Sequence, residues 1–149
     1  MEPPVVEVSP APREPLPRGP HGLPRDVVVR SQRSRLLGAL VDYPACARAF
    51  LLEVAAAGPS ALGIRDEIKQ RYVDLLRNLH AGFRERSPKL PEPPVEVFRA
   101  AVAAVDDMVV RWIREGRLHE LAKLEPIAVY VELALFGVPG AVRELGTSA

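Results

Sequence analysis

The sequence predicts an all-α fold, a bundle of about five to six main helices, and three observations support this. Of the 149 residues, 48% are hydrophobic but only 5% aromatic, and alanine, valine and leucine predominate, as in packed helices. Apolar residues recur every three or four positions through most of the chain after residue 25. No alternating strand pattern with hairpin turns is present, and the apolar run 127–136, which could form a buried strand, has no partner strand.

Proline divides the chain into two regions. Eight of its sixteen prolines precede Arg25. Because proline fixes φ and removes an amide donor, residues 1–25 are expected to be a Pro-rich disordered tail. The tail is either passive, including a wrongly chosen start codon, or a Pro-rich recognition ligand, and we favour the passive interpretation. Residues 26–149 are expected to form one helical domain.

The first helix is expected over residues 26–42. Arg30, Arg33 and Arg35 are assigned to its polar positions. The helix ends before Pro44, because the residue that precedes a proline is disfavoured in the α region.

The second helix is expected over residues 44–57, and it is apolar on nearly every side, which predicts burial all round. Gly58 and Pro59 end it. A third and longest helix follows over residues 60–86, with an apolar stripe over residues 68–83.

The fourth helix is expected over residues 95–115 and ends before Gly116. Leucines at every third position of residues 118–124 suggest a short helical turn. The fifth helix, residues 126–136, is apolar on nearly all sides except at Glu132.

A lone acid and a lone arginine stand out in the apolar stretch around residue 58. Glu53 lies on the second helix and Arg65 on the apolar stripe of the third. A charge buried alone is costly, so we predict a structural ion pair between them. Direct contact of either residue with a ligand is the less favoured alternative.

Two all-apolar helices are more than a domain of this size usually buries, so one of them needs cover from outside the chain. A symmetric homodimer is the commonest solution, here an antiparallel four-helix interface of the fourth and fifth helices with their copies. The alternative is a monomer with the fifth helix simply buried. The expected dimer residues are Ala100, Ala103, Ala104, Asp107, Arg111, Ile127, Tyr130, Val131 and Leu135.

The chain carries no catalytic motif, so we expect no enzyme, no catalytic residue, no metal site and no cofactor. His80 is interpreted as a solvated or hydrogen-bonded histidine on the flank of the third helix. The formal net charge of +1 does not favour nucleic acid. No membrane span or signal peptide is present, so a cytoplasmic location is expected.

An ordered series of short segments resembles the C-terminal ligand-binding and dimerisation domain of TetR-type transcriptional regulators. The likeness covers roughly residues 26–146. The segments are Tyr43-Pro44-Ala45, Arg48-Ala49-Phe50-Leu51-Leu52-Glu53, Ala56-Ala57-Gly58-Pro59 and Arg65. The resemblance implies an all-helical homodimer that binds a small apolar effector.

The resemblance also places an effector cavity among the first four helices. An apolar lining fits such a cavity and fits a solid core as well. The residues expected to line it are Leu36, Phe50, Tyr72, Leu76, Leu79, Phe98 and Val102.

The N-terminal region departs from the family, because a TetR-type regulator carries a helix-turn-helix ahead of this domain, and the Pro-rich tail stands in its place. DNA contact is therefore expected only through a helix-turn-helix absent from this chain. The chain is interpreted as a truncated gene product, a shortened gene model, or a stand-alone domain that pairs with a full-length regulator. A helical dimerisation or interaction module without a ligand is the alternative function.

Overall fold

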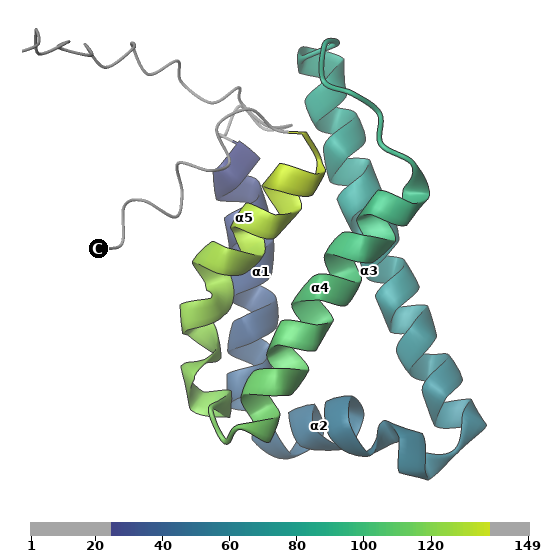
Figure 1. Ribbon diagram of the computed structural model, residues 1–149, viewed down its shortest axis with the longest axis vertical. Helices are drawn as coiled ribbons and strands as arrows, with labels where there is room; N and C mark the ends of the chain where they lie inside the picture. Colours follow the sequence, from purple (N-terminus) through teal and green to yellow (C-terminus); the bar gives the residue numbers. More distant parts are fainter. Residues whose placement is uncertain (1–24, 138–149) are drawn as a thin grey trace, which may run out of the picture.

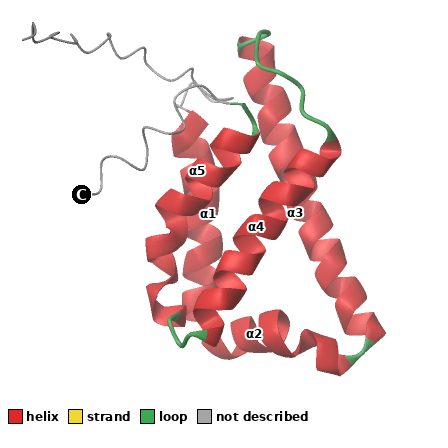
Figure 2. Ribbon diagram, in the orientation of Figure 1, coloured by secondary structure: helices red, strands yellow, loops and turns green. Residues whose placement is uncertain are grey.

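The computed structural model describes residues 25–137, and all regular structure within this range is helical (Figures 1 and 2). The expected all-α fold is confirmed, while the expected Pro-rich tail falls on residues outside the described range, apart from Arg25. Along the chain the elements are α1 (Arg25–Asp42), α2 (Pro44–Arg48), the π-helix η1 (Ala49–Glu53), the 3-10 helix η2 (Val54–Ala57), α3 (Pro59–Arg86), α4 (Val95–Arg114), the 3-10 helix η3 (Leu118–Leu124) and α5 (Glu125–Leu135).

The four long helices begin and end within one residue of the expected bounds. Proline accounts for several starts, because Pro44, Pro59 and Pro126 lie in the first turns of their helices, where an amide donor is not needed. Gly58 has a φ of +94°, which a residue with a side chain rarely adopts, and it separates η2 from α3 as expected.

The helices form an open, roughly triangular arrangement (Figure 1). α1 and α5 pack along each other, and α4 packs against both α5 and α3. The start of α4 lies near the C-terminal half of α3, and the two helices diverge from there. The segment formed by α2, η1 and η2 closes the base of the triangle and leads from α1 to α3.

Two clusters of buried side chains make up the core. The first joins α1, α3, α4 and α5 around Phe83 and Phe98. The second joins α1, α2, η1, α4, η3 and the start of α5 around Leu37 and Ile113. Leu118, Leu121 and Leu124 are all buried in the second cluster, because a 3-10 helix has three residues per turn and so aligns every third side chain. The expected turn at these leucines is confirmed.

The second helix differs from its expectation in two ways. It is not one α-helix, since α2, η1 and η2 have three different helical geometries. It is also not buried all round, because only Ala47, Leu51 and Val54 are buried. Five of the nine exposed positions are alanine, whose single methyl exposes little apolar area, so this segment can lie across the end of the bundle with one side open.

The long helix α3 buries a face rotated slightly from the expected stripe. Val73, Leu76, His80 and Phe83 are its buried residues. Ile68 lies within the expected stripe but is 43% exposed. The apolar stripe in the sequence is wider than the surface that the other helices cover.

Candidate functional site

An apolar pocket of about 100 Å³ lies among α1, η1, α3 and α4, where the triangle of helices opens. The pocket is open to solvent, and the exposed side chain of Ile68 is part of its lining. Its walls are formed by Arg33, Leu36, Leu40, Phe50, Leu51, Ile68, Lys69, Tyr72, Val102, Val105, Asp106 and Val109.

The pocket brings together four of the seven residues expected to line a cavity, namely Leu36, Phe50, Tyr72 and Val102. The other three lie elsewhere. Leu76 belongs to the first core cluster and Leu79 packs against it. Phe98 lines a separate groove. The pocket therefore includes only part of the expected lining, because Leu76 and Phe98 are buried in the first core cluster.

An ion-pair network forms one edge of the pocket. Asp106 on α4 forms ion pairs with two residues of α3. Its Oδ2 atom lies 2.8 Å from Arg65 Nη2 and 2.9 Å from Lys69 Nζ. The expected pair of Glu53 with Arg65 is wrong, because Glu53 is exposed on η1 and Arg65 faces α4 instead.

Asp106→Ala is expected to lower the free energy of unfolding by about 1–2 kcal/mol, because two partly buried cations lose their shared carboxylate. The measurement is urea unfolding followed by circular dichroism. The neighbouring substitution Asp107→Ala is the matched control. Its pair with Arg111 is open to water on both sides, so a change below about 0.5 kcal/mol is expected. Equal effects of the two substitutions would contradict this assignment.

The most deeply buried charges of the described residues are Arg33 on α1 and Glu132 on α5. Their side chains are 2% and 1% exposed, and Arg33 Nη2 donates a hydrogen bond to Glu132 Oε1. Arg33 also lies over the ring of Tyr72, 4.9 Å from its centroid. Through this side chain, the wall of the pocket is bonded directly to α5.

Burial changes the ionisation of both residues in this contact. Loss of water lowers the pKa of the Arg33 guanidinium below its ordinary value, and Tyr72 partly opposes that shift. Loss of water likewise raises the pKa of the Tyr72 hydroxyl, and the positive charge of Arg33 partly opposes it. Tyr72 therefore keeps its proton at neutral pH and remains a hydrogen-bond donor.

The sequence interpretation missed Arg33, assigning it to polar positions, whereas the structure buries it. Two signals point to it in hindsight. Val29, Arg33 and Leu37 are spaced four residues apart, and both of the flanking apolar residues are buried. Glu132 is the only acid within the apolar run 127–136, so it needed a cation from another helix.

The π-helix η1 contributes Phe50 and Leu51 to the pocket. π-Helices are rare in proteins, and those that occur are frequently found at functional sites. Here the wider turn lies directly on the pocket wall, which favours this pocket as the functional site.

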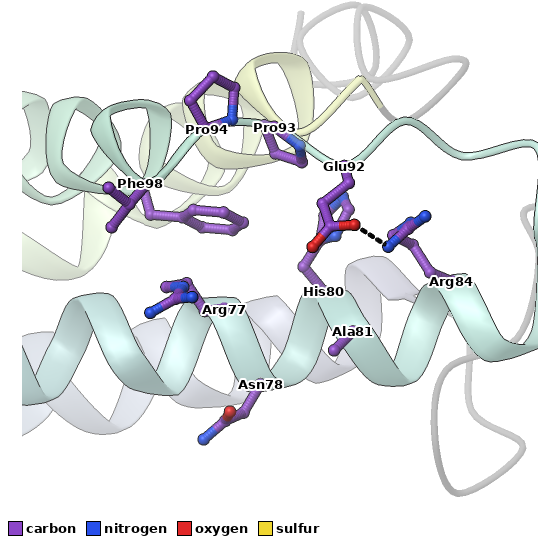
Figure 3. Close-up of a pocket in the computed structure, with 10 residues that line it drawn as sticks. Arg77, Asn78, His80, Ala81, Arg84, Glu92, Pro93, Pro94 and Phe98 are labelled. Atoms are coloured by element: carbon purple, nitrogen blue, oxygen red, sulfur yellow. Dashed lines mark hydrogen bonds and ion pairs between the residues drawn. The ribbon is translucent and has the colours of Figure 1, made fainter.

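A second hollow is an open groove of about 550 Å³ between α3 and the loop that leads to α4 (Figure 3). Arg84 and Glu92 pair across it, with 2.6 Å between Nη1 and Oε2. His80 lies beneath, 3.4 Å from the carbonyl oxygen of Phe136 and edge-on to the rings of Phe98 and Phe136. His80 is thus buried and hydrogen-bonded, not solvated, and we assign it to the packing of α3, α4 and α5.

Residues 25–137 contain no cluster of three or more side chains able to hold a metal ion. Among their helices, none combines the length and apolar character needed to span a bilayer. No family model matches the sequence, and no curated protein or solved structure is a significant match to the chain.

Proposed function

We propose that this chain is the effector-binding and dimerisation domain of a TetR-like transcriptional regulator, which takes a small apolar ligand into the pocket among α1, η1, α3 and α4. The observation that carries the proposal is the position of this pocket. The resemblance in the sequence places an effector cavity among the first four helices, and an apolar pocket lies there, lined by four of the expected residues.

The surface of α4 and α5 supports the dimerisation part of the proposal. All nine residues expected at the dimer interface are exposed or half-exposed in the protomer. Ile127 and Leu135, on α5, are 39% and 41% exposed. On α4, Ala100 and Ala103 are small enough for another helix to approach closely. The proposal assigns this face to a second copy and assigns no DNA contact to the described helices.

The pocket and the proposed dimer helix are physically linked. Arg33, in the pocket wall, is bonded to Glu132 on α5, and Arg30 pairs with Glu125 at the start of α5 at 3.2 Å. A ligand that displaces the pocket wall would therefore move Arg33 on α1, and Arg33 is bonded to Glu132 on α5. This connection supports the proposal that the pocket and the dimer face are coupled.

Small apolar compounds are expected to raise the thermal unfolding temperature of the protein, because a ligand that binds only the folded state stabilises it by mass action. Leu36→Trp fills the pocket and is expected to weaken that binding about tenfold or more. The control is Leu75→Trp, at a half-buried position on α3 outside the pocket wall. The measurement is a thermal-shift screen followed by titration calorimetry.

The alternative function, a dimerisation module without a ligand, predicts a different result in the same experiment. No compound would then stabilise the protein, or Leu36→Trp and Leu75→Trp would alter binding equally. The first result excludes an effector site, and the second places binding outside this pocket.

A further inference from the structure

A further hollow of about 190 Å³, here called the outer hollow, adjoins the apolar pocket where α3 meets α4. Two side chains, Lys69 and Val102, line both the outer hollow and the apolar pocket. The two spaces therefore lie next to each other, with these side chains between them. The full lining of the outer hollow is Asp66, Lys69, Gln70, Val73, Arg99, Val102 and Ala103.

The spacing of residues on α3 places Lys69 on the boundary between the two spaces. Ile68 and Tyr72, four residues apart, line the apolar pocket. Asp66 and Gln70, also four residues apart, line the outer hollow. Residues with this spacing share one face of a helix, so the two spaces lie against neighbouring faces of α3. Lys69 projects between those faces, and its side chain forms part of the partition.

The ion pairs around Lys69 allow this side chain to move. Asp106 accepts hydrogen bonds from Arg65 Nη2 at both carboxylate oxygens, at 3.1 and 2.8 Å, so it stays paired when Lys69 leaves. Lys69 is 35% exposed, and breaking a partly exposed ion pair costs little. Asp66, one turn earlier on α3, has no ion pair within residues 25–137 and is at the right spacing to accept Lys69.

The sizes and linings of the two spaces indicate the kind of ligand that would occupy both. The apolar pocket, at about 100 Å³, is smaller than the cavity of about 150 Å³ known to hold benzene, so a larger ligand extends beyond it. The outer hollow offers polar groups, including Gln70 and Arg99. Arg99 pairs with Glu96 at 3.6 Å, so this end of the joined space favours a polar group without charge.

We propose that Lys69 is a gate between the two spaces, paired with Asp106 when closed and with Asp66 when open. The open state admits an elongated amphiphile, whose unbranched hydrocarbon chain occupies the apolar pocket and whose uncharged polar end lies in the outer hollow. This inference rests on the proposed function and names the chemical class of its effector. Because a long ligand fits only the open state, its affinity includes the free energy of opening.

A series of primary alcohols tests the gate on the full chain: butan-1-ol, hexan-1-ol and octan-1-ol. Each additional buried methylene is expected to raise affinity about fourfold, and in the unmodified protein the rise is expected to continue to octan-1-ol. Nuclear magnetic resonance titration of the backbone amide signals measures the three dissociation constants.

Two substitutions test the partners of Lys69. Asp66→Asn removes the open-state partner, so it is expected to weaken octan-1-ol binding about threefold and to leave butan-1-ol binding unchanged. Asp66 acts here only through Lys69. In a Lys69→Ala background, Asp66→Asn is therefore expected to have no effect on either alcohol.

A matched pair of blocking variants identifies where a long ligand extends. Gln70→Trp fills the outer hollow and is expected to weaken octan-1-ol binding at least about tenfold, with butan-1-ol binding retained. Ala57→Trp is the control, because Ala57 lines a different hollow, which adjoins the apolar pocket at Phe50. This control is expected to leave all three affinities unchanged. Butan-1-ol binding shows in each variant that the apolar pocket is intact.

The gate and the proposed function fail in different ways. If octan-1-ol binds the unmodified protein no more tightly than butan-1-ol, or if Asp66→Asn affects both alcohols equally, the gate is overturned and the apolar effector site stands. If Ala57→Trp blocks octan-1-ol and Gln70→Trp does not, the ligand extends past Phe50 and the gate is likewise overturned. If no alcohol binds the unmodified protein, the proposed function fails with it.

Discussion

Glu132→Leu is expected to lower the free energy of unfolding by about 3–5 kcal/mol, the largest effect of any single polar substitution proposed for this protein. The substitution leaves the guanidinium of Arg33 charged, buried and without its carboxylate. A typical domain has a total stability of about 5–15 kcal/mol, so the loss is a large share of the whole. The measurement is urea unfolding at equilibrium, followed by circular dichroism.

The double variant Arg33→Met/Glu132→Leu separates the cost of an orphaned charge from the value of the pair. It removes both charges from the interior, so its stability is expected to return to within about 1 kcal/mol of the unmodified protein. Arg111→Ala is the control, because its pair with Asp107 is exposed and contributes little, about 0.5 kcal/mol or less. A double variant as unstable as Glu132→Leu would show that the pair itself stabilises the fold.

The double substitution Ile127→Glu/Leu135→Glu is expected to convert a homodimer into a monomer. Both side chains are part of the proposed α4–α5 interface and are well exposed in the protomer, so the fold tolerates their replacement. Two unpaired carboxylates in each copy would be desolvated at the interface. The dissociation constant is expected to rise on the order of a thousandfold, about 4 kcal/mol.

Analytical ultracentrifugation at micromolar concentrations measures this effect, with circular dichroism to check that the helices persist. Leu62→Glu/Ile64→Glu is the matched control, because it changes two exposed apolar residues at the start of α3, outside the proposed interface. This control is expected to remain a dimer. A monomeric unmodified protein, or dissociation by the α3 pair alone, would contradict the proposed interface.

Local signals in the sequence predicted the helices well. Pro44, Pro59 and Pro126 lie in first turns and Gly58 at a helix end, so the expected bounds are nearly those observed. These residues act through the backbone of their own turn, and no distant contact is needed to interpret them. The 3-10 helix η3 was visible for the same reason, in the spacing of its leucines.

The candidate site was predicted only in part. Four expected lining residues meet in the pocket, because apolar stripes identify which side of a helix faces inward. The partners of the charged residues were not predictable in the same way. Asp106, for example, pairs with both Arg65 and Lys69, and no spacing in the sequence links these residues. Such pairs depend on crossing angles between helices far apart in the chain.

The sequence by itself determined the all-helical class, the order and lengths of the helices and the apolar surplus on α5, since each depends on residues within a few turns of one another. Only the tertiary structure decided which residue partners the buried arginine of α1. Arg30, Arg33 and Arg35 are equally charged, but α5 packs so that Glu132 meets Arg33. Burial of a charge depends on what covers it, and the cover here comes from a helix about a hundred residues away.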